Sequence, residues 1–137
     1  MSARDERSAP EGTGERAREK FERTHVAFAV ADSGPGPAGF ALVTVPGSGV
    51  PEDPPEAAYL AMVAVSPERQ SAGLGSLLLD DVTARARTAG HRMLVLHVLL
   101  SNVRAVRLYR EHGWHPLGRP APHSLSGAFS QTYVRRL

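Results

Sequence analysis

The sequence predicts a single α/β domain, in which helices flank one β-sheet. Apolar runs of strand length alternate with stretches whose apolar residues recur at helical spacing, and glycines and prolines separate them. With 137 residues and 42% hydrophobic content, the chain can build one core but not two. Residues 1–23 differ because they are polar and interrupted by Pro10 and two glycines. We expect a polar tail over residues 1–23, with room for one short helix, and a folded domain over residues 24–137.

The first half of the domain predicts a hairpin followed by a buried strand. Residues 24–30 and 39–45 are suited to strands, and turn-forming residues occupy positions 32–37 between them. A loop rich in proline, glycine and acidic residues spans positions 46–55. Residues 57–65 are too apolar for an exposed strand, so we expect a central, buried strand.

Two helices and three strands are predicted after this central strand. Apolar residues from Leu74 to Ala89 fall at helical spacing. Residues 93–100 form the next strand, and a second helix follows, capped by Ser101 or Asn102. Residues 114–137 predict two strands around a loop rich in proline and glycine.

The composition excludes several kinds of function. The chain has no cysteine, so it has no disulfide, no thiolate metal ligand and no cysteine nucleophile. No apolar stretch approaches the roughly 18 residues of a membrane span, and the charged N-terminal segment lacks the apolar part of a signal peptide. We therefore expect a soluble, cytoplasmic protein with no membrane partner and no bound metal.

Charge is distributed unevenly along the chain. Residues 76–137 carry nine basic and three acidic residues, whereas residues 26–75 carry one basic and five acidic residues. Arg104, Arg107 and Arg110 recur along the second predicted helix, where they face either the phosphates of a nucleotide or solvent. Because the net charge is only +2 and aromatic residues do not alternate with the basic ones, we expect no nucleic-acid partner.

The junction between the central strand and the first helix has the form of an anion-binding site. The strand ends in Val-Ser-Pro, and Gln70, Gly73 and Gly75 follow in the pattern Gln-x-x-Gly-x-Gly. A helix start leaves main-chain N–H groups without internal partners and carries partial positive charge. Glycines allow a ligand to approach these groups closely, so the junction is suited to phosphate.

Two familiar nucleotide motifs do not fit this junction. A P-loop requires a lysine and a hydroxyl after its last glycine, but Ser76 and Leu77 stand there. The dinucleotide fingerprint requires a third glycine where this chain has Leu78.

A second pattern further along completes a resemblance. Asn102, Ala105, Leu108 and Tyr109 form Asn-x-x-Ala-x-x-Leu-Tyr, and a Gly-Trp step follows. Each pattern alone is moderately specific, but both in this order resemble the signatures of the GCN5-related N-acetyltransferase (GNAT) family. The resemblance covers about residues 24–137. It implies the GNAT fold, a mixed and mostly antiparallel sheet splayed between its two central strands and flanked by helices, with the N-terminal strand and helices shortened in this chain.

The resemblance implies transfer of an acetyl group from acetyl-CoA to a primary amine. The amine, on a small molecule or on a protein N-terminus or lysine, would attack directly in a ternary complex, since no cysteine can carry the acetyl group. Main-chain groups of the strand and of the helix start would hold the thioester and the pyrophosphate, and an asparagine would contact the pantetheine arm. The implied acetyl-CoA-binding residues are Val63, Ala64, Val65, Gln70, Ser71, Ala72, Gly73, Leu74, Gly75, Ser76 and Asn102. The same residues also suit a buried strand, a plain turn and a helix cap.

Two residues are the implied catalytic groups. Tyr109 is similar in position to the family's general acid, although it also suits a core aromatic. His97 is the first candidate for the base, because N-terminal acetyltransferases of ribosomal proteins place a glutamate at this strand position and histidine titrates near neutral pH. A structural histidine is the alternative. Glu56 and His123 are weaker candidates for the base.

Two other functions and the choice of acceptor stay open. A non-catalytic acyl-CoA-binding or regulatory module would keep the same fold, and a basic nucleic-acid binder would show affinity that falls steeply with salt. Glu52, Asp53 and Glu56 suit either a cationic acceptor or a solvated loop. The sequence does not name the amine. Dimers are frequent in the family, so a homodimer is one expected assembly.

Overall fold

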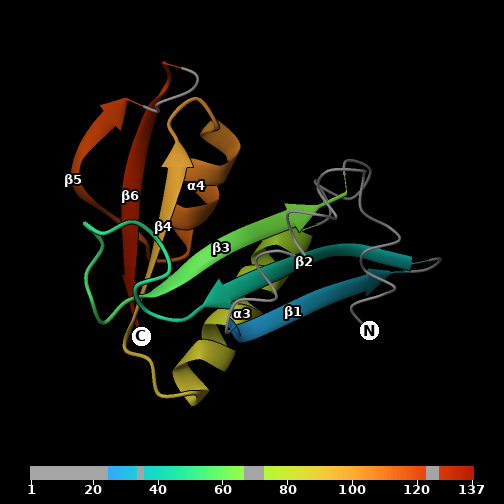
Figure 1. Ribbon diagram of the computed structural model, residues 1–137. Helices are drawn as coiled ribbons and strands as arrows, with labels where there is room; N and C mark the ends of the chain where they lie inside the picture. The colour runs from blue at the N-terminus through green and yellow to red at the C-terminus, as the bar shows by residue number, and fades with distance from the viewer. Residues whose placement is uncertain (1–24, 34–35, 67–72, 123–126) are drawn as a thin grey trace.

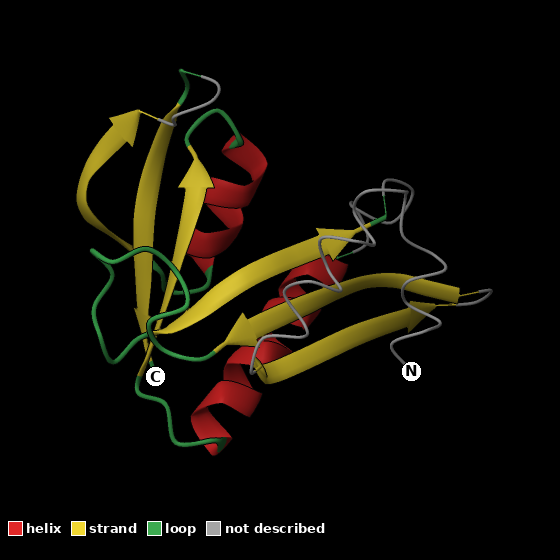
Figure 2. Ribbon diagram, viewed as in Figure 1, coloured by secondary structure: helices red, strands yellow, loops and turns green. Residues whose placement is uncertain are grey.

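The described part of the chain is a six-stranded sheet with two helices. The computed structural model describes residues 25–33, 36–66, 73–122 and 127–137. The polar tail predicted over residues 1–23, with its short helix, lies outside these residues. The strand order is β1-β2-β3-β4-β6-β5. Figures 1 and 2 show α3 behind the first three strands and α4 behind β4, so both helices lie on one face of the sheet.

The elements follow one another in the predicted order. They are β1 His25–Ser33, β2 Gly36–Thr44, β3 Ala58–Val65, α3 Leu74–Thr88, β4 Met93–Leu99, α4 Val103–Glu111, β5 His115–Pro122 and β6 Phe129–Arg136. The hairpin between β1 and β2 is tighter than the turn predicted over positions 32–37, because Asp32 and Ser33 still pair with Pro37 and Gly36. At the end of α3, Gly90 adopts φ 96° and the His91 N–H donates to the Ala86 carbonyl at 3.1 Å, which stops the helix.

The sheet parts between β3 and β4. These strands are parallel and pair at two positions only, Ala58 with Leu94 and Tyr59 with Val95. Beyond this point β3 continues beside β2, and β4 continues beside β6. The facing edges of β3 and β4 therefore lack each other as hydrogen-bond partners, and Figure 1 shows the two halves of the sheet diverging. The predicted splay between two central strands is confirmed.

One apolar core lies between the sheet and the helices. Leu94, Leu96 and Val98 of β4 pack in it with Leu79 and Val82 of α3. Since side chains alternate along a strand, His97 projects from the opposite face of β4. The loop between β2 and β3 passes over that face in front of β4 and β6 (Figure 1), which brings this acidic loop to His97.

Neither of the two described helices is both long and apolar enough to cross a bilayer.

Candidate active site

A groove of about 850 Å³ opens where β3 and β4 part. Its walls come from β3, the first turn of α3, the second half of β4 and one side of α4. The lining residues are Leu60, Ala61, Met62, Val63, Val65, Gly73, Gly75, Ser76, Leu96, His97, Val98, Leu99, Asn102, Arg104, Ala105, Arg107, Leu108, Tyr109 and Glu111. Elements that are distant in sequence thus contribute to one elongated space.

Most of the predicted site residues that the structure describes meet in this groove. The predicted residues that line it are Val63, Val65, Gly73, Gly75, Ser76, His97, Asn102 and Tyr109. Ala64 and Leu74 are not among the lining residues, although each lies between two that are. Gln70, Ser71 and Ala72 lie outside the described residues.

The first turn of α3 presents main-chain donors to the groove. Gly73 precedes the helix with φ 78°, and the first intrahelical bond runs from the Leu77 N–H to the Gly73 carbonyl at 3.2 Å. The N–H groups of the preceding helical residues therefore have no helical partner. Among the described residues, no side chain caps this end and no acidic residue lies in the first turn, so none of them neutralises the positive end of the helix.

A chain of hydrogen bonds ties this turn to the end of α4. His112 Nε2 lies 3.0 Å from Ser76 Oγ, and His112 Nδ1 lies 2.9 Å from Asp80 Oδ1. A carboxylate only accepts, so Nδ1 carries a proton, and in the neutral ring Nε2 accepts from the serine hydroxyl. No local sequence pattern indicates this contact, because His112 and Ser76 are 36 residues apart. It holds the two helices together beside the groove.

Asn102 and two arginines line the α4 side. Asn102 is the N-cap of α4, and its Oδ1 accepts from the Ala105 N–H at 3.2 Å, which leaves its amide nitrogen available as a donor. Arg104 and Arg107 line the groove, whereas Arg110 donates to the Tyr133 hydroxyl at 3.3 Å. The arginine row predicted on this helix therefore divides into two groove residues and one structural contact.

Tyr109 combines a partly buried ring with a place in the groove wall. Its ring packs against Trp114 with centroids 5.7 Å apart, and no hydrogen bond to its hydroxyl occurs within the described ranges. Burial raises the pKa of Tyr109 to about 12, because the phenolate would lose its hydration. At physiological pH the group is therefore a neutral phenol that can donate a proton.

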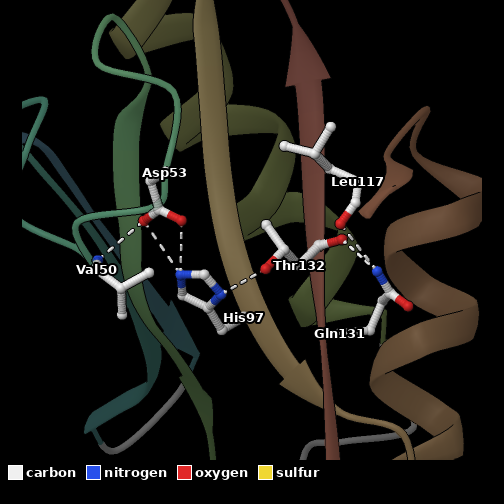
Figure 3. A network of polar contacts seen from close by, with 6 residues as sticks. All are labelled: Val50, Asp53, His97, Leu117, Gln131 and Thr132. Carbon is white, nitrogen blue, oxygen red and sulfur yellow. Dashed lines mark hydrogen bonds and ion pairs between the residues drawn. The ribbon is translucent and has the colours of Figure 1, made fainter. Parts of the chain in front are cut away.

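His97 is held by hydrogen bonds at both ring nitrogens (Figure 3). Nε2 lies 3.0 Å from Asp53 Oδ1 and 3.1 Å from Asp53 Oδ2, and Nδ1 lies 3.0 Å from Thr132 Oγ1. The side chain of Asp53 is only 5% exposed, and its Oδ2 also accepts from the Val50 N–H at 3.1 Å. The ring of Tyr59 lies 5.9 Å from the imidazole. His97 was predicted from the sequence, but its hydrogen-bond partners Asp53 and Thr132 were not.

The structure describes only one of the two weaker candidates for the base. Glu56 is exposed on the β2–β3 loop and is not a lining residue. His123 lies outside the described residues. Within those residues no group of three or more potential metal ligands occurs.

This arrangement can hold an extended anionic ligand and exchange protons near its end. The helix start and the arginines favour phosphate, and the unpaired edge of β3 offers main-chain groups to a polar chain. The phenol and the imidazole lie further along the same groove.

Comparison with solved structures identifies the same fold. The ribosomal-protein-S18-alanine N-acetyltransferase from Escherichia coli superimposes with a TM-score of 0.73 at 20% identity, over 98% of this chain and 85% of that one. A Bacillus anthracis protein in complex with acetyl coenzyme A gives 0.70 at 15% identity, over 88% and 67%. Nourseothricin acetyltransferase gives 0.66 at 24% identity over 80% of this chain, which spans 64% of that protein's length. A search of curated proteins finds no match.

The sequence model of the acetyltransferase (GNAT) family matches residues 2–114. The match begins within the segment predicted as a tail and includes both motifs, the splayed strands and α4. The chain therefore belongs to the GNAT acetyltransferase family.

Proposed function

We propose that this protein is an acetyl-CoA-dependent N-acetyltransferase that acts on a primary amine of a small molecule or a protein. The observation that carries this proposal is the groove itself, which joins the unpaired edge of β3 to the start of α3 and to Tyr109. The fold shared with a protein solved in complex with acetyl coenzyme A supports the choice of donor.

Acetyl-CoA would lie along the groove as the first substrate. The N–H groups at the start of α3, together with residues 70–72 before it, would bind the pyrophosphate, with Arg104 and Arg107 nearby for further phosphate charge. The Asn102 amide would donate to the pantetheine arm. Main-chain groups from Val63 to Val65 would bind the thioester end, where N–H donors stabilise the charge that develops on the carbonyl oxygen.

In the chemical step the neutral amine attacks the thioester carbonyl carbon and the C–S bond breaks. The second proton, lost by the acylated nitrogen, goes to the departing CoA thiolate, which leaves as the thiol. Because the pKa of Tyr109 is raised to about 12 and that of an ordinary thiol is about 8.5, complete proton transfer to the free thiolate is uphill by roughly 5 kcal/mol. The Tyr109 hydroxyl therefore acts mainly by hydrogen bonding to the departing sulfur in the transition state. His97 accepts the proton that the amine must lose.

Thiol release with a panel of amines tests this function. The chain has no cysteine, so a thiol reagent reports only the CoA that is produced. We expect turnover on at least one amine, and loss of the hydroxyl in Tyr109→Phe should lower kcat by about 10- to 100-fold while KM for acetyl-CoA changes little. Binding of acetyl-CoA without turnover on any amine would instead identify a non-catalytic module.

A further inference from the structure

The two hydrogen bonds of His97 determine which nitrogen can accept a proton. An ionised carboxylate has only acceptor sites, and Asp53 uses Oδ2 to accept from the Val50 N–H as well. His97 Nε2 must therefore carry a hydrogen, which it donates to Asp53. In the neutral ring, Nδ1 is then the nitrogen with the lone pair, and that lone pair accepts from the Thr132 hydroxyl.

The sheet fixes Thr132 in this position. Thr132 on β6 is the register partner of His97 on β4, so the two side chains lie on the same face of the sheet. That face is opposite the helices, because Leu96 and Tyr133, the neighbours of this pair, both belong to the helix-side core. Thr132 is partly exposed there, as is His97. Thr132 is not among the residues that line the groove, so the relay requires an acceptor whose amine lies on this face of the sheet, within reach of both Thr132 and the opening.

Asp53 is too well covered to meet a substrate itself. Its side chain is 5% exposed against 19% for His97, and the absence of a side chain at Gly49 leaves the space that its carboxylate occupies. It can act through the imidazole, because a carboxylate that accepts from Nε2 keeps the hydrogen of the neutral ring on that nitrogen. Asp53 is in this sense a positioning residue.

Resting on the proposed function, we propose that His97 receives the amine's proton through Thr132, and that Asp53 sets the tautomer that makes this possible. The amine nitrogen releases one proton to Thr132 Oγ1, while the hydroxyl proton of Thr132 passes to His97 Nδ1. The amine is left neutral with its lone pair for attack, Thr132 is unchanged, and His97 becomes an imidazolium beside Asp53. After the reaction, the imidazolium returns its proton to water.

The tautomer can be measured without any activity. In nitrogen-15 spectra of the histidine side chains, the His97 signals are those absent from His97→Ala. We expect the neutral ring to carry its hydrogen on Nε2, Asp53→Asn to weaken that preference, and Thr132→Val to shift the Nδ1 signal. Asp81→Asn, which removes the carboxylate of an exposed pair with Arg85, is the control and should leave these signals in place. A hydrogen on Nδ1 in the wild type overturns the proposal.

Kinetics test the relay. With an amine that the wild type acetylates, Thr132→Val should lower kcat at least about tenfold with an unchanged KM for acetyl-CoA, and Thr132→Ser should restore most of it. In the His97→Ala background the same change should have less than about a twofold effect, because the hydroxyl no longer has a base to serve. Thr83→Val, which removes a hydroxyl bonded to the Leu79 carbonyl on α3, controls for the substitution itself.

The outcomes separate this proposal from the proposed function. Full activity of Thr132→Val, or an equal loss in the presence and absence of His97, overturns the relay while the enzyme assignment stands. If the wild type acetylates no amine, both fail, and the spectra still report whether Asp53 sets the tautomer. Thermal unfolding identifies any variant that has lost its fold. If Thr132→Val is unfolded, the activity of Thr132→Ser decides whether the hydroxyl is needed.

Discussion

Tyr109 lines the groove as a neutral phenol, because its surroundings disfavour the phenolate. The ring packs on Trp114, and burial raises the pKa of the phenol to about 12. Below pH 10 both the folded and the unfolded chain carry a neutral tyrosine, so this burial has no effect on the pH dependence of stability. Between pH 10 and 12 the phenol ionises in the unfolded chain but stays mostly neutral in the folded one. The free energy of unfolding therefore falls over this range.

This difference predicts a loss of stability in alkali that depends on one residue. As the pH rises from 9 to 11, the wild type should lose about 1 kcal/mol more than Tyr109→Phe in its free energy of unfolding, because the variant has no phenol to ionise. Urea unfolding at intervals over this range measures it. Parallel curves for the two proteins would show that Tyr109 is not buried as the structure describes.

Asn102 carries two roles that two substitutions can separate. Asn102→Ala removes the cap on the Ala105 N–H and should destabilise the protein by about 1 kcal/mol. Asn102→Ser keeps a capping oxygen but removes the amide donor, so it should retain stability. Both should weaken acetyl-CoA binding in calorimetry. If Asn102→Ser binds acetyl-CoA as tightly as the wild type, Asn102 acts only as the helix cap.

The residues of the site were predictable to different degrees. His97 and Tyr109 match positions in the motifs of the GNAT family, so the resemblance implied a place at the site for both, and both line the groove. Asp53 is 44 residues from His97 and lies in a loop whose path depends on the sheet it crosses. Thr132 required the pairing of β6 with β4, which no local pattern encodes.

At the scale of elements, the start of α3 offers a matched pair of glycines. Gly73 adopts φ 78°, so alanine there is strained although nothing lies within 4 Å of an added Cβ. At Gly75 an added Cβ would meet Leu108 Cδ2 at 3.4 Å, an ordinary contact, and alanine favours the helix.

We therefore expect Gly73→Ala to lower the free energy of unfolding by about 1 kcal/mol and Gly75→Ala to leave it unchanged or higher. Gly75→Ala should still weaken acetyl-CoA binding, because its methyl group enters the groove wall where phosphate must approach the main chain. Chemical denaturation and calorimetry on both variants measure the two quantities. Unchanged acetyl-CoA binding by Gly75→Ala would show that the phosphate does not bind at this turn.

Gly39 on β2 pairs with the half of β3 that has parted from β4. A Cβ there would lie 2.5 Å from the Ala64 carbonyl oxygen and 3.1 Å from Leu78 Cδ1, so strand or helix must shift to admit it. Gly39→Ala should destabilise the protein by about 1 to 3 kcal/mol. Thermal denaturation measures this, and an unchanged melting temperature would contradict the close approach of β2 to β3.

The order and type of the elements were predictable because apolar spacing differs between strands and helices. The opening of the sheet was not, since β3 and β4 are apolar strands whose side chains give no sign of which edges are paired. Only the resemblance to the GNAT family implied that Val63 to Val65 lack partners on β4, and the two-residue register of these strands confirms it.

In the molecule as a whole, the two faces of the sheet carry different residues of the candidate site. Helices α3 and α4 cover one face and bring the first turn of α3, Asn102 and Tyr109 to the groove. The other face carries His97, Thr132 and the acidic β2–β3 loop. Donor and acceptor would therefore approach the opening from opposite sides, which suits direct attack in a ternary complex.

The proposed function depends on acetyl-CoA binding in this groove, and an amide nitrogen-15 titration can detect that binding residue by residue. On addition of acetyl-CoA, the signals of Val63, Val65, Leu74, Gly75 and Ser76 should shift together and saturate, while those of the exposed strand β5 should stay in place. If millimolar acetyl-CoA shifts no signal, or only signals of β5, the groove between β3 and β4 is not the binding site and the account is wrong.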